Sequence, residues 1–350
     1  MTLLILRGSL DFVKGGLLSS FQSENGLTDF WYTIVSAGVV VAWLFVLDGH
    51  RMLRGTTLAT AWTWSFLSAT AWMATWFADQ CGSAMTAALA DHAWYVCGVL
   101  SLCSPIAVLG SRRPGTQVWT WFIVVPMLLA LFWPIAALRL QGSELRRIQL
   151  ETPQLVAFCL VLIMGVGNYC GTRFTIAALM YGCSILAIVL SSSAASPLWL
   201  MDRSATRFWC TAVMVLAIGV VKKSTRPVAA TRFDQLWFDF FDLFGIVWGR
   251  RIQDRVNFIA RKEGLPVRLE LDGFVWPKVS SFAGPSAPIG ERVRHEQTNV
   301  ETGNLNTTET EARIEHILRW LLRRFVNPPW IDDRLGSRSD QRISELVADS

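Results

Sequence analysis

The chain has 350 residues, of which 52% are hydrophobic and only 17% are charged, whereas ordinary soluble domains carry about 25% charged residues. The charge is uneven, because residues 1–221 hold 12 Lys and Arg with 9 Asp and Glu, and residues 222–350 hold 20 and 18. This composition excludes an ordinary soluble domain for the first part, and a net charge of only +5 argues against a nucleic-acid partner. We expect an all-α integral membrane protein with a charge-rich, partly ordered cytosolic tail.

The N-terminal segment, residues 1–29, is predicted to form a short surface helix and not a secretory signal. Its apolar run is only five residues long, and Arg7 follows that run instead of preceding it. No clear cleavage site with small residues comes next, although a signal peptide needs one.

Residues 30–221 are predicted to form a bundle of seven transmembrane helices. The strongest evidence is residues 154–191, two apolar runs of about 18 residues on either side of Arg173. A helix needs roughly 20 apolar residues to cross a hydrocarbon layer, so these runs indicate a transmembrane hairpin. The other predicted spans are Phe30–Leu47, Thr57–Ala78, Ala93–Gly110, Gln117–Leu138 and Phe208–Val221. Arg203 and Arg207 must snorkel at the start of the last span, so six spans is the main alternative.

The orientation follows from Lys and Arg in the connections, which are enriched on the cytoplasmic side. With the tail in the cytoplasm, nine of these residues lie inside and seven outside. The connection from Asp79 to His92 has none, while both neighbouring connections are basic. We expect a cell-membrane protein with its N-terminus outside and its C-terminus in the cytoplasm.

The predicted spans contain no Asp, Glu, Lys, Arg or His. Cation transporters, retinal proteins and intramembrane proteases need such groups at membrane depth, so these classes are disfavoured. The seven cysteines form no CxxC pair and no His/Cys cluster with metal-ligand spacing. We therefore predict no catalytic residue, no metal and no cofactor.

The remaining polar residues of the bundle suggest one candidate pocket. It consists of Asn168, Tyr169, Tyr181, Asp91 and His92. The alternative, which we favour, is structural. Asn168 then bonds a neighbouring helix, Gly167 and Gly171 form a GxxxG close-packing surface, Asp91 caps a helix and His92 is solvated.

Residues 222–276 contain a long amphipathic helix with an aromatic stripe and, after it, a run of cations. The candidate contact residues are Phe233, Trp237, Phe240, Phe244, Arg250, Arg251 and Arg255. One interpretation places this helix in the headgroup layer of the membrane, where apolar burial and anionic lipid both stabilise it. The other interpretation makes it a cytosolic helix that packs on the following segment or on the undersides of the spans, and both stay open.

The end of the chain contains three further predicted elements. Residues 265–276 alternate apolar and charged residues and contain Asp272-Gly273, which predicts a short β-hairpin that needs a helix beneath it. Residues 277–307 have little periodicity and predict a flexible linker. Residues 308–350 begin with a capping box and predict a basic amphipathic helix followed by the C-terminal tail.

An uncharged bundle with an elaborate tail predicts a non-enzymatic membrane protein. We expect a sensor-like or scaffold bundle whose tail binds the lipid bilayer or a cytosolic protein partner, with no nucleic acid involved. The alternative is a transporter of an uncharged or lipidic solute. A membrane enzyme acting on a lipid-like substrate through loop residues such as Asp91, His92 and Glu144 is the third hypothesis.

Overall fold

The structure is a computed structural model that describes residues 26–81, 85–113, 115–140, 147–193, 202–224, 229, 231–276 and 309–335. The chain divides into two compact units, Met1–Thr225 and Arg226–Ser350. The predicted N-terminal helix falls almost wholly outside the described residues, as do the predicted linker and the C-terminal tail beyond Leu335.

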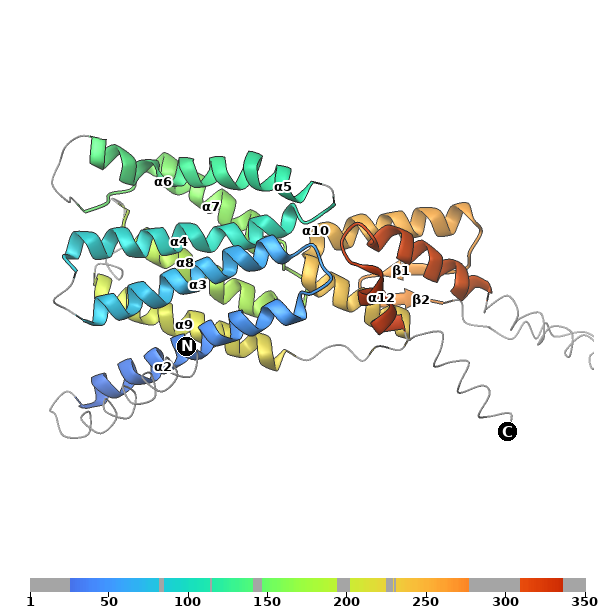
Figure 1. Cartoon of the computed structure of the whole chain (residues 1–350), viewed down its shortest axis with the longest axis horizontal. Helices are drawn as coiled ribbons and strands as arrows, with labels where there is room; N and C mark the ends of the chain where they lie inside the picture. Colours follow the sequence, from blue (N-terminus) through green and yellow to red (C-terminus); the bar gives the residue numbers. More distant parts are fainter. Residues whose placement is uncertain are drawn as a thin grey trace, which may run out of the picture. The chain divides into compact units, whose positions relative to one another are not determined.

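Helices of the first unit occupy all seven predicted places and run side by side (Figure 1). Six of them are α2 (Gly26–Met52), α3 (Ala59–Gln80), α4 (Ala87–Leu109), α7 (Thr152–Gly167), α8 (Thr175–Leu190) and α9 (Arg203–Lys223). At the remaining place, α5 (Thr116–Trp119), a π-helical turn η1 (Thr120–Val124) and α6 (Val125–Leu140) follow one another without a break.

Four helical stretches in the described residues are long and apolar enough to cross a membrane, namely α2, α4, Thr120–Leu140 and α9. The apolar helices α7 and α8 have only 16 residues each. Helix α3 has 22 residues, but its many Trp, Thr and Ser residues lower its mean hydropathy. The helical fold class is therefore confirmed, and the four stretches are consistent with a membrane protein. The count of seven spans stays a prediction.

Large apolar side chains point outward from the first unit. They include Val41 of α2, Leu129 and Trp133 of α6, Leu160 and Ile163 of α7, Ile176 of α8, and Trp209 and Leu216 of α9, each more than half exposed. A soluble monomer rarely leaves so many large apolar side chains in water. Lipid tails would cover them, so this surface supports membrane insertion.

Helix α4 forms the centre of the bundle, because most of its residues are buried, whereas α2 buries only Val35, Ser36 and Val39. Its Val99 and Leu102 are fully buried against Phe158 of α7 and Ile185 of α8. Serine hydroxyls join α4 to α3, with Ser68 and Ser101 2.8 Å apart. Such bonds between helices satisfy polar groups that lipid cannot hydrate.

Glycines allow close helix contacts, but not the two glycines that the sequence suggested. A Cβ atom at Gly98 of α4 would lie 3.0 Å from Val189 of α8, closer than an ordinary van der Waals contact, so glycine favours the close approach of these helices. A Cβ at Gly167 would meet nothing within 4 Å. Gly171 has φ +82° and forms the turn between α7 and α8. Because α7 ends at Gly167, the two glycines do not lie on one helical face, and the prediction of a GxxxG packing surface is wrong.

The second unit contains α10 (Arg232–Lys262), a helix over residues 309–322 and α12 (Pro328–Leu335). Its two-stranded antiparallel sheet joins β1 (Arg268–Glu270) to β2 (Gly273–Val275), with Leu269 opposite Phe274. The predicted hairpin is thus confirmed, and it packs on α10 as expected (Figure 1). Gly273 has φ +119°, a backbone conformation that side chains other than glycine rarely adopt.

Gly245 breaks α10 into two helical halves, because its φ of 75° and ψ of −176° are not helical. In the first half the buried stripe contains Phe240 and Phe244, as the periodicity predicts. In the second half the stripe shifts to Trp248, Ile252 and Val256, and Val247 becomes more than a third exposed. The side of α10 that faces outward is therefore a different one after Gly245.

Candidate functional site

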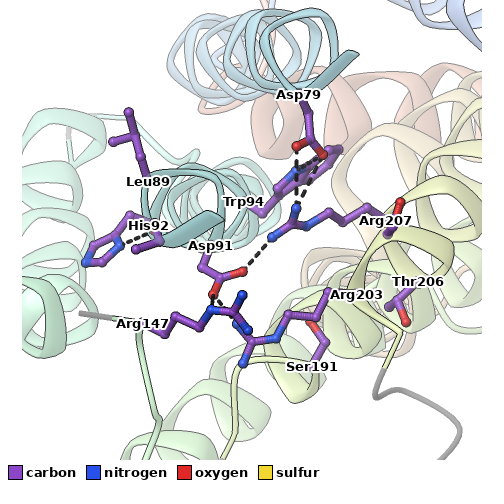
Figure 2. A network of polar contacts seen from close by, with 12 residues as sticks. Asp79, Leu89, Asp91, His92, Trp94, Arg147, Ser191, Arg203, Thr206 and Arg207 are labelled. Carbon is purple, nitrogen blue, oxygen red and sulfur yellow. Dashed lines mark hydrogen bonds and ion pairs between the residues drawn. The ribbon is translucent and has the colours of Figure 1, made fainter. Parts of the chain in front are cut away.

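A cluster of five charged side chains is the most concentrated polar feature in the described part of the first unit (Figure 2). It consists of Asp79, Asp91, Arg147, Arg203 and Arg207. They come from four places: the last turn of α3, the start of α4, the segment before α7 and the start of α9. With two carboxylates and three guanidinium groups, the cluster carries a net charge of +1.

Local sequence explains how α9 presents its two arginines. Asp202 caps the helix, and its carboxylate accepts hydrogen bonds from the backbone amides of Ser204 and Ala205 at 3.0 and 3.1 Å. Arg203 and Arg207 then follow four residues apart, which places them on one helical face. Figure 2 shows both side chains directed from α9 toward α3 and α4.

Asp91 is the centre of the cluster, with a side chain only 3% exposed. Its Oδ1 accepts a hydrogen bond from Nη2 of Arg207 at 2.5 Å. Its Oδ2 accepts one from Arg203 and lies 3.8 Å from Nε of Arg147. A carboxylate this deeply buried is stable only with such partners.

Asp79 extends the cluster to α3. Both of its oxygens lie 3.4 Å from Nη1 of Arg207, and Oδ2 also accepts a hydrogen bond from Nε1 of Trp94 at 3.0 Å. Arg207 therefore bridges two carboxylates from two helices. The ion pairs of Arg203 and Arg207 with Asp79 and Asp91 thus join α3, α4 and α9.

The sequence-based interpretation of this region was wrong in three ways. Arg203 and Arg207 do not snorkel outward but bind the carboxylates. The cap of α4 is Thr86, not Asp91, and Thr86 accepts a hydrogen bond from Leu89. His92 is buried, not solvated, and its Nδ1 lies 2.6 Å from the carbonyl oxygen of Ala88. As expected for adjacent helical residues, His92 and Asp91 point in different directions (Figure 2).

Of the five residues of the predicted pocket, the structure brings Tyr169 and Tyr181 within range of an electrostatic interaction but places Asp91 and His92 elsewhere along α4. Asp91 and His92 are at its start. Tyr181 is near its middle, where its hydroxyl donates to the carbonyl oxygen of Ser101 at 2.6 Å. Asn168 and Tyr169 follow α7, whose Gly165 contacts Pro105 near the other end of α4. Residues 91 and 105 are separated by about 20 Å along a helix, so the five side chains do not share one pocket.

The aromatic stripe of α10 lies inside the second unit. Phe233, Trp237, Phe240 and Phe244 are at most 2% exposed, and the rings of Phe240 and Phe244 each lie 5.3 Å from Phe325. These four residues therefore cannot contact a membrane surface, because the following segments of the chain cover them. For the aromatic half of the helix, this burial agrees with the interpretation that packs it within a subdomain. Arg250, Arg251 and Arg255 lie exposed, and their contact with a membrane or a partner stays a prediction.

Ion pairs brace the second unit around this core. Arg334 of α12 donates to buried Asp239 of α10 at 2.7 Å. Arg319 donates to Glu315 at 3.0 Å and to Asp332 at 2.5 Å. Burial alone would lower the pKa of Arg319, but these hydrogen bonds raise that pKa above its ordinary value. Arg319 therefore stays charged at every physiological pH.

The described residues contain no group of three or more His, Cys, Asp or Glu side chains that could hold a metal ion. Comparisons with protein-family models, with curated proteins and with solved structures found no match to this chain.

Proposed function

We propose that this protein is a non-enzymatic membrane scaffold, in which a seven-pass bundle in the cell membrane anchors a separately folded cytosolic module. The observation that carries the proposal is the contrast between the two units. The first exposes large apolar side chains, whereas the second encloses its aromatic side chains and exposes charged ones. The first surface suits lipid and the second suits water.

The charges at the two ends of the bundle support the proposed orientation. At one end, Arg203 and Arg207 are held by Asp79 and Asp91. The opposite end carries exposed cations, among them Arg51, Arg112, Arg113, Lys222 and Lys223. Lys and Arg near span ends are retained on the cytoplasmic side, so we assign this second end to the cytoplasm.

The interior of the bundle supports an anchoring role over transport. Trp72, Trp76 and Trp94 fill the space between α2, α3 and α4, and each is at most 6% exposed. Their indole nitrogens donate to Ser101, Ser36 and Asp79. Large side chains held by hydrogen bonds do not leave a path for a solute in this part of the bundle.

The proposal is tested by separating the two units. The fragment Arg226–Ser350 should be soluble and should unfold in one cooperative transition, because its core is its own. It should then be fused to an unrelated membrane anchor and to a promiscuous biotin ligase, with the ligase-tagged full chain as reference. The anchored fragment and the full chain should biotinylate the same cellular proteins. An insoluble fragment, or labelling that requires the native bundle, would contradict the proposal.

A further inference from the structure

The second half of α10 and the start of β1 border an open groove of about 800 Å³. It is lined by Arg251, Asp254, Arg255, Asn257, Phe258, Arg261, Val267 and Arg268. The lining holds four arginines and one aspartate, a net charge of +3. Phe258, 51% exposed, lies among the arginines.

The positive charge of the groove is available to a ligand. Within the described residues, no carboxylate lies within 4 Å of Arg251, Arg255 or Arg261, and Arg268 has only exposed Glu270 at 3.6 Å. Aromatic rings hold two of the side chains, since the guanidinium of Arg251 lies 4.8 Å from the Trp248 ring and that of Arg255 lies 5.4 Å from the Phe258 ring. These ring contacts favour defined positions for the Arg251 and Arg255 side chains before any ligand binds.

The spacing along α10 makes this a single face. Arg251, Arg255 and Phe258 follow one another at four and three residues, the spacing of neighbours on one side of a helix. The opposite side, with Ile252 and Val256, is buried in the module. A rigid basic face with one protruding aromatic ring is the pattern of surfaces that bind at the boundary between headgroups and acyl chains.

We propose that this groove binds anionic phospholipid headgroups of the membrane that holds the bundle, with Phe258 entering the headgroup layer. The inference rests on the proposed scaffold function, because the bundle must first place the module at a membrane. Only residues 224–231 separate Lys223, the end of α9, from Arg232, the start of α10. A fully extended chain of that length spans only about 30 Å. Because this short connection ties the module to the membrane-embedded bundle, the groove meets a high effective concentration of headgroups. This favours lipid as the ligand over a dilute acidic protein.

The test uses the full chain in nanodiscs with Phe258→p-benzoylphenylalanine, a photoreactive residue of similar shape. Nanodiscs of phosphatidylcholine are compared with nanodiscs containing about one-third phosphatidylglycerol, and lipid adducts are measured by mass spectrometry after irradiation. We expect phosphatidylglycerol adducts that decrease with added salt, because screening weakens contacts to an anionic surface.

A charge-matched pair of variants makes the test specific. Arg251→Gln/Arg255→Gln should lower the adduct yield at least fivefold, since each basic residue near such a surface contributes a factor of about five. Arg313→Gln/Arg324→Gln removes two exposed arginines outside the groove and should leave the yield unchanged. Circular dichroism checks that all variants keep their helices.

Three results would overturn the inference. Equal adduct yields in the two lipid mixtures would mean that charge plays no part. Equal losses in the two double variants would mean that the groove is not the site. Absence of lipid adducts, with crosslinks to an acidic protein when whole cells are irradiated, would make the groove a protein-binding site. In each case the scaffold proposal stands if the fragment Arg226–Ser350 still folds alone.

Discussion

Replacing Asp91 by asparagine tests the ion pairs at the start of α9. The substitution keeps the size of the side chain but removes the charge that Arg203 and Arg207 face. Breaking a fully buried ion pair costs about 3–5 kcal/mol. Here Arg203 is 24% exposed and water can partly solvate it, while Arg207 keeps Asp79 at 3.4 Å. We therefore expect Asp91→Asn to lower the free energy of unfolding by about 2–3 kcal/mol.

The matched control is Asp48→Asn in α2. Asp48 is 57% exposed and lies 3.6 Å from Arg51, which is 80% exposed. An exposed pair of this kind contributes at most about 0.5 kcal/mol. Both variants can be unfolded by sodium dodecyl sulfate in detergent micelles while helical circular dichroism is followed.

A double variant shows whether the lost stability belongs to the ion pair. The double variant Asp91→Asn/Arg203→Gln has no uncompensated arginine at position 203. Its loss in free energy of unfolding should therefore be smaller than the sum of the losses of the two single variants, by about 1 kcal/mol or more. If Asp91→Asn costs no more than Asp48→Asn, or if the two changes are additive, the cluster does not clamp the helices.

Four further substitutions test the packing. Gly98→Leu should destabilise the bundle by about 1–3 kcal/mol in the same micelle assay because it has no space, whereas Gly167→Leu should be nearly neutral; equal effects would contradict the assigned helix contacts. Gly273→Ala should lower the melting temperature of the second unit, because its Cβ would lie 2.5 Å from Asp234 Oδ1 at a φ of +119°; an unchanged melting temperature would contradict that geometry. Phe325→Ala should cost about 3–5 kcal/mol in chemical unfolding of the fragment Arg226–Ser350, and a cost below 1 kcal/mol would mean that the aromatic core is assigned wrongly.

Local patterns in the sequence predicted much of the fold. Apolar runs located helices at all seven predicted places in the described part of the first unit, and Gly171 to Arg173 marked the turn between α7 and α8. Alternation before Asp272-Gly273 located the hairpin. These features depend on residues close together in the chain, which is why they can be recognised without knowing the tertiary structure.

The ion cluster depends on contacts between distant residues and was missed. Arg207 and Asp79 are 128 positions apart, and no local pattern links them. A signal was nevertheless present, because two arginines four residues apart opened an apolar helix, and two acids bordered a connection without cations. Opposite charges at the same predicted membrane depth could have been paired on that basis.

The aromatic stripe of α10 shows a second limit of periodicity. The pattern identified the apolar face of the helix, but a membrane and a protein core can both cover such a face. The decision came from Phe325, more than 80 residues after Phe240 in the chain. Likewise, the buried face of α10 shifts at Gly245. The non-helical backbone of this glycine, which causes the shift, is seen only in the structure.

The most direct test of the membrane arrangement uses two native cysteines. Cys81 follows α3 and Cys170 lies in the turn between α7 and α8, and both are exposed. Two variants, each retaining only one of these cysteines, are treated in intact cells with a membrane-impermeant maleimide. The proposed arrangement predicts that Cys81 is labelled in intact cells and that Cys170 is labelled only after permeabilisation. The reverse result would invert the orientation, and labelling of both cysteines from the same side would contradict the alternating passes on which the scaffold account depends.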